Sequence, residues 1–191
     1  VDFIKNYMKI YTPETLSLSL QNLHGKILER AETLGYKESD LLFAERSPEK
    51  SYSFVNYAYK EVNNIPDNQF TDEASLKICQ AALRNKILVF LDDCTISGDS
   101  IHSDVSELRY MKRPEVPAIY ACVCGTEKAE KRFRGKYNTS LIIGDKIEAL
   151  PSPSKFSRKN DIVAQVGDAE YSNGGRTCII FPYMAPDNNV G

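Results

Sequence analysis

The sequence predicts an α/β fold, with a doubly wound, mainly parallel sheet and a small appended C-terminal lobe. Short, uniformly apolar segments, typical of strands buried on both faces of a parallel sheet, alternate with segments of helical spacing. The alternation stops after residue 145, where the lobe begins. At 191 residues the chain fits a single domain with one core.

The first expected element is a long amphipathic helix over residues 13–35. Thr12 offers a capping hydroxyl, and Pro13 suits the first helical position. Apolar residues then recur at spacings of three and four as far as Leu34, and Gly35 is typical of a helix end.

The core follows this helix and spans about residues 38–145. Its expected strands are 40–45, 87–91, 117–124 and 139–143, and its expected helices are 53–62, 72–85, 100–111 and 127–137. Tyrosines spaced through 52–59 leave a strand open as the alternative for 53–62, and 63–70 has the composition of a turn. Parallel strands joined through helices imply right-handed crossovers, with helices on both faces of the sheet.

Residues 146–191 make up the appended lobe. The segment 150–160 is rich in proline, serine and lysine, and 162–166 and 178–181 are expected strands outside the alternation. Because the chain begins at Val1 without a methionine, we expect a processed or excised piece of a longer protein.

Charge and cysteine usage narrow the function classes. A formal net charge of −2 makes nucleic-acid binding by direct charge an unfavourable hypothesis. No apolar run reaches the roughly 18 residues that a membrane span needs. The five cysteines lie outside CxxC pairs and suit reduced thiols. We therefore expect a cytoplasmic protein with no membrane partner.

Two adjacent acids mark the candidate site. The apolar strand 87–91 is followed by Asp92 and Asp93, and ligands of open parallel sheets bind outside the carboxyl ends of strands. Adjacent carboxylates next to an anion site suggest a polar sugar or a divalent metal as their partner, because they would otherwise repel the anion.

A loop of small and hydroxyl residues is expected over residues 94–100, before the next helix. Backbone amides, the helix N-terminus and the hydroxyls of Thr95, Ser97 and Ser100 together predict a phosphate site. Gly98 supplies either a positive φ or a close backbone approach.

This segment resembles type I phosphoribosyltransferases, whose motif is four apolar residues, two acids, three variable residues, a hydroxyl residue, glycine, any residue and another hydroxyl residue. Residues 88–100 read LVFLDDCTISGDS. The resemblance implies that Asp92 and Asp93 are catalytic and hold the ribose hydroxyls of phosphoribosyl pyrophosphate. It implies Mg²⁺ as the cofactor, bound by these two acids indirectly, through the ligand. The phosphoribose-binding residues that it implies are Cys94, Thr95, Ile96, Ser97, Gly98, Asp99 and Ser100.

The centre of the motif departs from the family pattern. Cys94 and Thr95 stand where the family usually has aliphatic residues, and Ile96 stands where a small or hydroxyl residue is usual. Asp99 adds a negative charge beside the expected phosphate. These departures keep a binding module without turnover open as the alternative.

In that family the loop after the first core strand binds diphosphate. The matching residues are Glu45, Arg46, Ser47, Lys50, Ser51 and Ser53. Arg46 and Lys50 would neutralise the diphosphate, and the serine hydroxyls would donate to it. A solvated loop of mixed charge is the alternative.

The C-terminal segment 179–189, IIFPYMAPDNN, offers Tyr183, Asp187 and Asn188 for binding a base, although it is also a good turn. A Pro-Asp-Asn element after a double-acid loop is similar to phosphoribosyltransferase-like domains of bacterial conflict and antiviral systems, including some retron effectors.

The expected function is therefore transfer or cleavage at ribose C1 of phosphoribosyl pyrophosphate or a related nucleotide. The alternative is an inactive nucleotide-sensing module or an effector subunit of an antiviral defence complex. The sequence leaves a homo-oligomer or a defence-complex partner open as the assembly.

Overall fold

The computed structural model describes residues 8–45, 52–72, 83, 85–96, 98, 101, 117–133, 139–148 and 178–182. The expected strand 162–166, most of the expected helices 72–85 and 100–111, and the end of the expected helix 127–137 lie outside the described residues.

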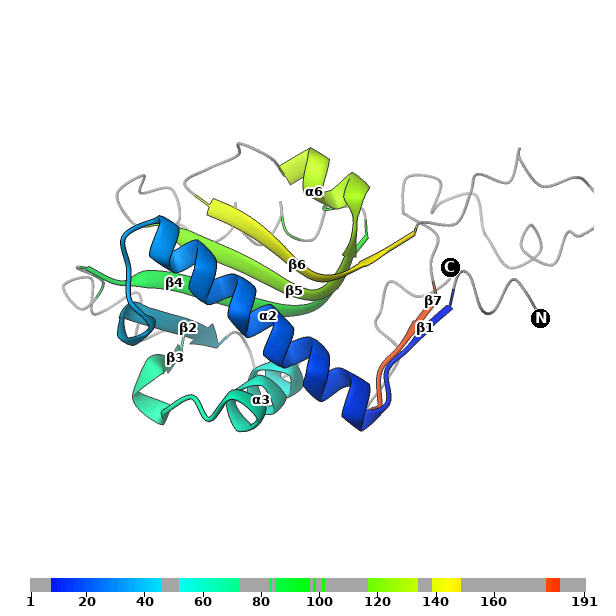
Figure 1. Ribbon diagram of the computed structural model, residues 1–191, viewed down its shortest axis with the longest axis horizontal. Helices are drawn as coiled ribbons and strands as arrows, with labels where there is room; N and C mark the ends of the chain where they lie inside the picture. The colour runs from blue at the N-terminus through cyan, green and yellow to red at the C-terminus, as the bar shows by residue number, and fades with distance from the viewer. Residues whose placement is uncertain are drawn as a thin grey trace, which may run out of the picture.

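Five parallel strands form the central sheet, in the order β3-β2-β4-β5-β6 (Figure 1). Their bounds are β2 (Leu41–Glu45), β3 (Phe70–Asp72), β4 (Ile87–Thr95), β5 (Ala118–Thr126) and β6 (Thr139–Ile147). The predicted parallel sheet is confirmed.

The strand order reverses between β2 and β4. From β2 the chain moves outward to β3, then returns past β2 to β4 and continues outward through β5 and β6. Because the chain leaves β2 and β4 in opposite directions along the sheet, the two connections move apart. A crevice is expected between them, at the carboxyl ends of these strands. This place in the sheet is where a ligand is expected.

Helices cover both faces of the sheet, as predicted. The helices α2 (Pro13–Thr33) and α3 (Tyr52–Asn63) pack in one apolar cluster with strand residues such as Val89 and Ala121. The helix α6 (Glu127–Phe133) contributes Phe133 to a second cluster with Phe90 and Tyr120. The sheet is thus buried on both sides, which explains its uniformly apolar strands.

The long helix α2 begins at the residue that the sequence predicted and ends within two residues of the predicted end. The Thr12 hydroxyl accepts a hydrogen bond from the Thr15 amide, Pro13 begins the helix, and Gly35 takes a φ of +84° after its end. The buried stripe consists of Leu16, Leu20, Leu23, Ile27 and Ala31, with Ser19 among them. Figure 1 shows α2 lying across the sheet.

Several boundaries differ from the prediction: β5 ends two residues later than expected, and β6 runs to Ile147, past the expected start of the appended lobe. Phe70–Asp72 forms the edge strand β3 beside β2, so Asp72 ends a strand and does not begin a helix. The strand β4 continues through Asp92 to Thr95, because β5 provides partners for its last residues. The alternative of a strand for 53–62 is wrong, since α3 is helical throughout.

A second, two-stranded sheet joins segments from the two ends of the chain. The strand β1 (Met8–Ile10), which the sequence did not predict, pairs in parallel with β7 (Cys178–Ile180). The two lie side by side next to the first turn of α2 (Figure 1). The strand β7 lies outside the five-stranded sheet, as expected.

Across the described ranges, no helix is both long enough and apolar enough to cross a membrane.

Candidate phosphoribose site

Asp92 is held in place by two donors at the carboxyl half of β4. Its side chain is buried, with Oδ1 accepting from the Asp93 amide at 3.0 Å and Oδ2 accepting from the Tyr120 hydroxyl at 2.6 Å. Tyr120 lies on the adjacent strand β5 and is fully buried. Because a buried carboxylate needs hydrogen-bond donors, Tyr120 fixes the position of this acid.

Asp93 is buried as well, and its backbone is held by the neighbouring strand. Its Oδ1 accepts from the Cys94 amide at 2.7 Å, and its carbonyl accepts from the Cys124 thiol of β5 at 3.7 Å. Both acids of the motif therefore lie within the sheet and have fixed local contacts.

Cys94 and Thr95 belong to β4, so the predicted loop begins later than expected. They pair with Cys124 and Gly125 of β5. Gly125 permits this extension: a Cβ there would lie 2.8 Å from Thr95 Cγ2 and 2.9 Å from the Thr95 carbonyl oxygen. The Thr95 hydroxyl is buried and has no hydrogen-bond partner among the described residues.

The loop after β4 is tied to the start of α6. The Thr126 hydroxyl donates to the Ile96 carbonyl and accepts from the Ala129 amide, so it caps α6 and anchors the loop together. Gly98 has a φ of +79°, and a Cβ there would lie 3.4 Å from Ala129 Cα. Gly98 thus combines the positive φ and the close approach that the sequence offered as alternatives.

Most of the other predicted site residues lie outside the described residues. They are Arg46, Ser47, Lys50, Ser51, Ser97, Asp99, Ser100, Tyr183, Asp187 and Asn188. Of the predicted diphosphate loop, Glu45 ends β2 and Ser53 lies in the first turn of α3, both exposed.

Asn56 of α3 was not predicted as a site residue. It is buried, and its Oδ1 has no hydrogen-bond partner within the described part of the chain. Its place on the helix that follows the predicted diphosphate loop makes it a candidate for contact with a polar ligand.

A second polar cluster lies at the ends of β5 and β6. Cys94, Cys124 and Asp145 are register partners on three adjacent strands. Asp145 Oδ2 accepts from the Tyr11 hydroxyl and from Ser19 Oγ, both at 2.9 Å, and pairs with Lys9 at 3.1 Å. Burial raises the pKa of Asp145, but these donors outweigh burial and hold the pKa below its ordinary value.

Comparison with known protein families identifies the family of this chain. The family model described as PRTase-CE, a phosphoribosyltransferase-like domain, matches residues 4–182. The chain belongs to the PRTase-CE family. No curated protein and no solved structure matches it. The resemblance inferred from the double-acid motif is thereby confirmed at the level of the domain.

The thiols of Cys94, Cys122 and Cys124 in this PRTase-CE chain are buried within the sheet. Burial raises the pKa of Cys124 to about 12, and burial together with the neighbouring Asp93 raises the pKa of Cys94. Protonated, buried thiols are poor nucleophiles and poor metal ligands. Cys94 therefore acts as a small apolar residue that packs in the core beneath the motif.

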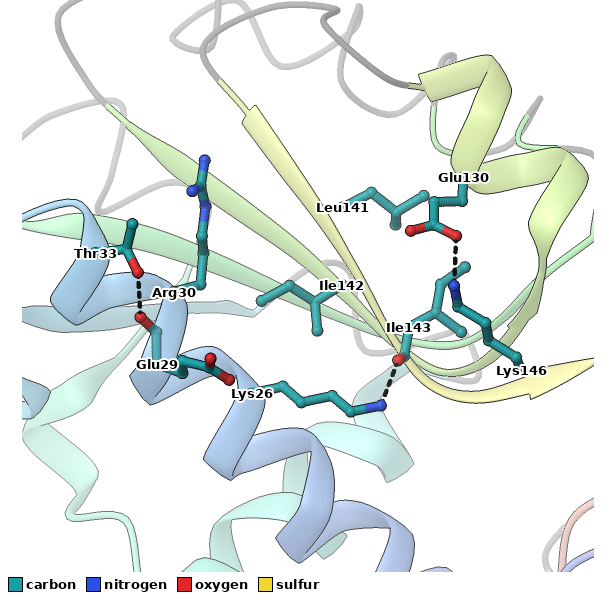
Figure 2. A pocket seen from close by; sticks show the side chains of 9 residues that line it. All are labelled: Lys26, Glu29, Arg30, Thr33, Glu130, Leu141, Ile142, Ile143 and Lys146. Carbon is teal, nitrogen blue, oxygen red and sulfur yellow. Dashed lines mark hydrogen bonds and ion pairs between the residues drawn. The ribbon is translucent and has the colours of Figure 1, made fainter.

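A separate pocket of the PRTase-CE domain lies along β6, between α2 and α6 (Figure 2). Lys146 pairs with Glu130 at 2.8 Å, and Lys26 donates to the carbonyls of Ile143 and Gly144. The residues that line it are Lys26, Glu29, Arg30, Thr33, Glu130, Leu141, Ile142, Ile143 and Lys146. None of the predicted site residues is among them.

Proposed function

We propose that this PRTase-CE domain binds phosphoribosyl pyrophosphate, or a related phosphorylated ribose or nucleotide, and transfers or cleaves at ribose C1. The observation that carries the proposal is the position of Asp92 and Asp93. They lie on β4, beside the reversal of strand order in a phosphoribosyltransferase-like sheet.

Ribose recognition would fall to the two buried acids. Carboxylates accept hydrogen bonds from sugar hydroxyls, and charge-assisted bonds of this kind are roughly twice as strong as neutral ones. Tyr120 already holds Asp92 through its hydroxyl at 2.6 Å, so Asp92 needs little reorganisation to act. Both acids lie on β4, the central strand of the sheet, which is paired on both sides.

The phosphate of the ribose would lie against the loop after β4. The buried Thr95 hydroxyl is a polar group without a partner in the described structure, and Gly98 brings the backbone close to α6. Ser97, Asp99 and Ser100 would complete this cradle, with the serine hydroxyls donating to the phosphate.

The diphosphate would lie at the carboxyl ends of β2 and β4, next to the loop that follows β2. Arg46 and Lys50 carry the positive charge that it needs, and Ser47, Ser51 and Ser53 carry hydroxyl donors. Asn56 would add an amide from the first half of α3. A base would be held by Tyr183, Asp187 and Asn188.

Mg²⁺ would reach this site together with the ligand. Carboxylate and phosphate oxygens are the donors that Mg²⁺ prefers, so the diphosphate would hold the ion and Asp92 and Asp93 would act on it indirectly, through the ligand. The ion would neutralise the charge of the diphosphate.

The domain would accelerate the reaction by positioning and electrostatics. Cleavage at C1 develops positive charge on the sugar, and the carboxylates of Asp92 and Asp93 would stabilise this charge if they hold the ribose hydroxyls. Fixing the sugar and its phosphate at two ends also removes rotational freedom before reaction.

The test is binding followed by turnover. With Mg²⁺ and phosphoribosyl pyrophosphate at a hundred times the Kd, the domain should gain about 2.7 kcal/mol of stability in a thermal-shift assay. Asp93→Asn keeps the shape of the side chain and should weaken binding by about tenfold or more, because a charged acceptor is lost.

Asp67→Asn is the matched control. Asp67 begins a short 3₁₀ turn before β3, at the amino end of that strand, and its side chain is exposed. The control should bind like the wild type. An Asp93→Asn variant with unchanged binding and turnover would show that the site is elsewhere.

A second candidate is a nucleotide sensor without turnover, acting alone or as a subunit of a defence complex. The unusual centre of the motif favours it: Cys94 and Thr95 belong to β4, so the loop that would hold the phosphate is shortened. Calorimetry that detects phosphoribosyl pyrophosphate binding, with no diphosphate released across a panel of bases, would support the sensor over the transferase.

A further inference from the structure

The ring of Tyr120 is enclosed by the core, so its hydroxyl has a set position. Tyr120 is fully buried on β5, and its ring stacks on Phe90, its register partner on β4, with centroids 6.5 Å apart. Phe133 of α6 packs in the same apolar cluster. Because neighbours of this kind leave a ring no room to turn away, the hydroxyl is a fixed donor.

Asp92 is held by a donor at each of its carboxylate oxygens. Oδ2 accepts from the Tyr120 hydroxyl at 2.6 Å, a length typical of charge-assisted O–H···O⁻ bonds, and Oδ1 accepts from the Asp93 amide at 3.0 Å. Two donors set the plane of the carboxylate. Since a carboxylate has about four acceptor sites, these bonds do not exhaust its capacity for a sugar hydroxyl.

The hydroxyl of Tyr120 brings the fold little stability. Burying a carboxylate costs free energy, and replacing both partners of a buried hydrogen bond by apolar groups of the same shape is often nearly neutral. A ring without a hydroxyl would fill the same space beside Phe90 and Phe133. The consequence of the hydroxyl therefore lies at Asp92.

We infer that Tyr120 is a positioning residue that makes the site selective for phosphorylated ribose over phosphorylated deoxyribose: its hydroxyl holds Asp92 where the acid accepts from one ribose hydroxyl. The inference rests on the proposed function, in which Asp92 and Asp93 hold the ribose hydroxyls. A site built around a fixed, buried acceptor rejects a ligand without the matching hydroxyl, because burial without that hydrogen bond is costly. An acid that could turn would discriminate less.

The test compares calorimetric affinities for ribose 5-phosphate, 2-deoxyribose 5-phosphate and 3-deoxyribose 5-phosphate. The wild type should prefer ribose 5-phosphate over each analogue by about tenfold or more, as expected for a hydrogen bond to a charged group. Asp92→Asn should reduce one of these two preferences, which assigns the hydroxyl that Asp92 accepts. Tyr120→Phe, which keeps the ring, should reduce the same preference to about threefold or less and leave the other unchanged.

Tyr59→Phe is the matched control. Tyr59 of α3 is also fully buried, and its hydroxyl forms a hydrogen bond of the same length, 2.6 Å, with His24 Nδ1 of α2. This variant loses a buried hydroxyl away from Asp92, so it should keep both preferences.

A double variant locates the effect at the acid. Adding Tyr120→Phe to Asp92→Asn should change the three affinities little further, because the acceptor that Tyr120 positions is already altered. A second full loss of affinity would show that Tyr120 acts elsewhere.

A measurement without ligand separates this inference from the proposed function. Scalar couplings in NMR should report one side-chain rotamer of Asp92 in the unliganded wild type and in Tyr59→Phe. In Tyr120→Phe they should report an average of rotamers.

An equal loss of affinity for all three ligands in Tyr120→Phe would overturn the inference, and so would unchanged preferences in Tyr120→Phe or in Asp92→Asn. If the wild type binds no phosphorylated ribose, the proposed function fails, and the couplings then decide whether Tyr120 positions Asp92. Averaging confined to Tyr120→Phe supports that role, whereas the same rotamer behaviour in Tyr120→Phe and Tyr59→Phe refutes it.

Discussion

Single glycines set how closely the strands approach at the candidate site. Gly125 faces Thr95 across the β4–β5 pair, and a methyl group there would lie within 3.0 Å of both the Thr95 side chain and its backbone. Since the contact includes backbone, rotation of one side chain does not relieve it. The carboxyl end of β4 therefore depends on a residue of the neighbouring strand.

Gly125→Ala should destabilise the domain by about 1–3 kcal/mol, because it overpacks a dense core. It should also weaken ligand binding by shifting Thr95. Gly25→Ala is the control: nothing lies within 4 Å of its Cβ, and alanine favours the helix, so stability should rise by about 0.5–1 kcal/mol. Denaturant titration measures both changes. Equal effects at the two glycines would refute the packing argument.

Asp145 gives the domain a pH-dependent contribution to stability. Its pKa lies below the ordinary value in the folded chain, so its contribution is present above the unfolded pKa of about 3.9. The contribution is lost as the pH falls through the lower, folded pKa. The groups that surround it are Lys9, Tyr11, Ser19 and Cys124.

Asp145→Asn should therefore cost about 1–2 kcal/mol at neutral pH, where charged hydrogen bonds are replaced by neutral ones. The difference from wild type should shrink below about pH 4. Denaturant titrations at several pH values measure it, with the exposed Asp67→Asn as the control. A cost that stays constant into acid would contradict the role assigned to the charge.

At the scale of elements, the sequence predicted the helices and strands that depend on residues close together in the chain. The helix α2 follows from its capping residue and its apolar spacing, and β4 follows from an apolar run that ends in two acids. Asp92, Asp93 and Gly98 were recognisable because the motif is contiguous, whereas the continuation of β4 to Thr95 depends on its partner β5.

The short strands and the long-range side-chain contacts could not be predicted from the sequence, because they depend on pairing between residues that are distant in the chain. The strands β1 and β3 are three residues long and exist through their partners β7 and β2. Asp145 meets Tyr11 across 134 positions and Ser19 across 126. Tyr120 looked like one more apolar strand residue, and only the register with β4 brings its hydroxyl to Asp92.

The edge strand β6 is protected by α2. Lys26 of α2 donates to the carbonyls of Ile143 and Gly144, and Arg30 donates to the Ser140 hydroxyl (Figure 2 shows Lys26 pointing to β6). In the five-stranded sheet as described, β6 has a strand neighbour on one side, β5. A lysine at an exposed edge is a device against pairing with another chain.

Lys26→Met should lower the free energy of unfolding by about 1 kcal/mol and increase self-association as the concentration rises. Light scattering over a concentration series measures the average molar mass of the protein in solution and so detects self-association. Lys131→Met removes an equivalent charge from an exposed ion pair on α6 and should leave the mass unchanged. Identical molar masses for the two variants at all concentrations would show that Lys26 does not prevent β6 from pairing with another chain.

At the scale of the whole molecule, the strand pair β1–β7 belongs to the main core. Tyr11, Ile179 and Phe181 are members of the same apolar cluster as Leu20 of α2 and Val89 of β4. A segment whose apolar side chains are shared with the sheet has little reason to unfold separately. We therefore expect one cooperative transition for the described fold.

Phe181→Ala tests this cooperativity. Removing a buried aromatic ring should cost about 3–5 kcal/mol and lower the Tm by about 6–20 °C for a chain of this size. Tyrosine signals in near-UV circular dichroism and backbone signals in far-UV should still change together. Ile180→Ala, at an exposed neighbouring position, should have a much smaller effect. If the near-UV signal of Phe181→Ala is lost first, the strand pair melts alone, and the expectation of one cooperative transition is wrong.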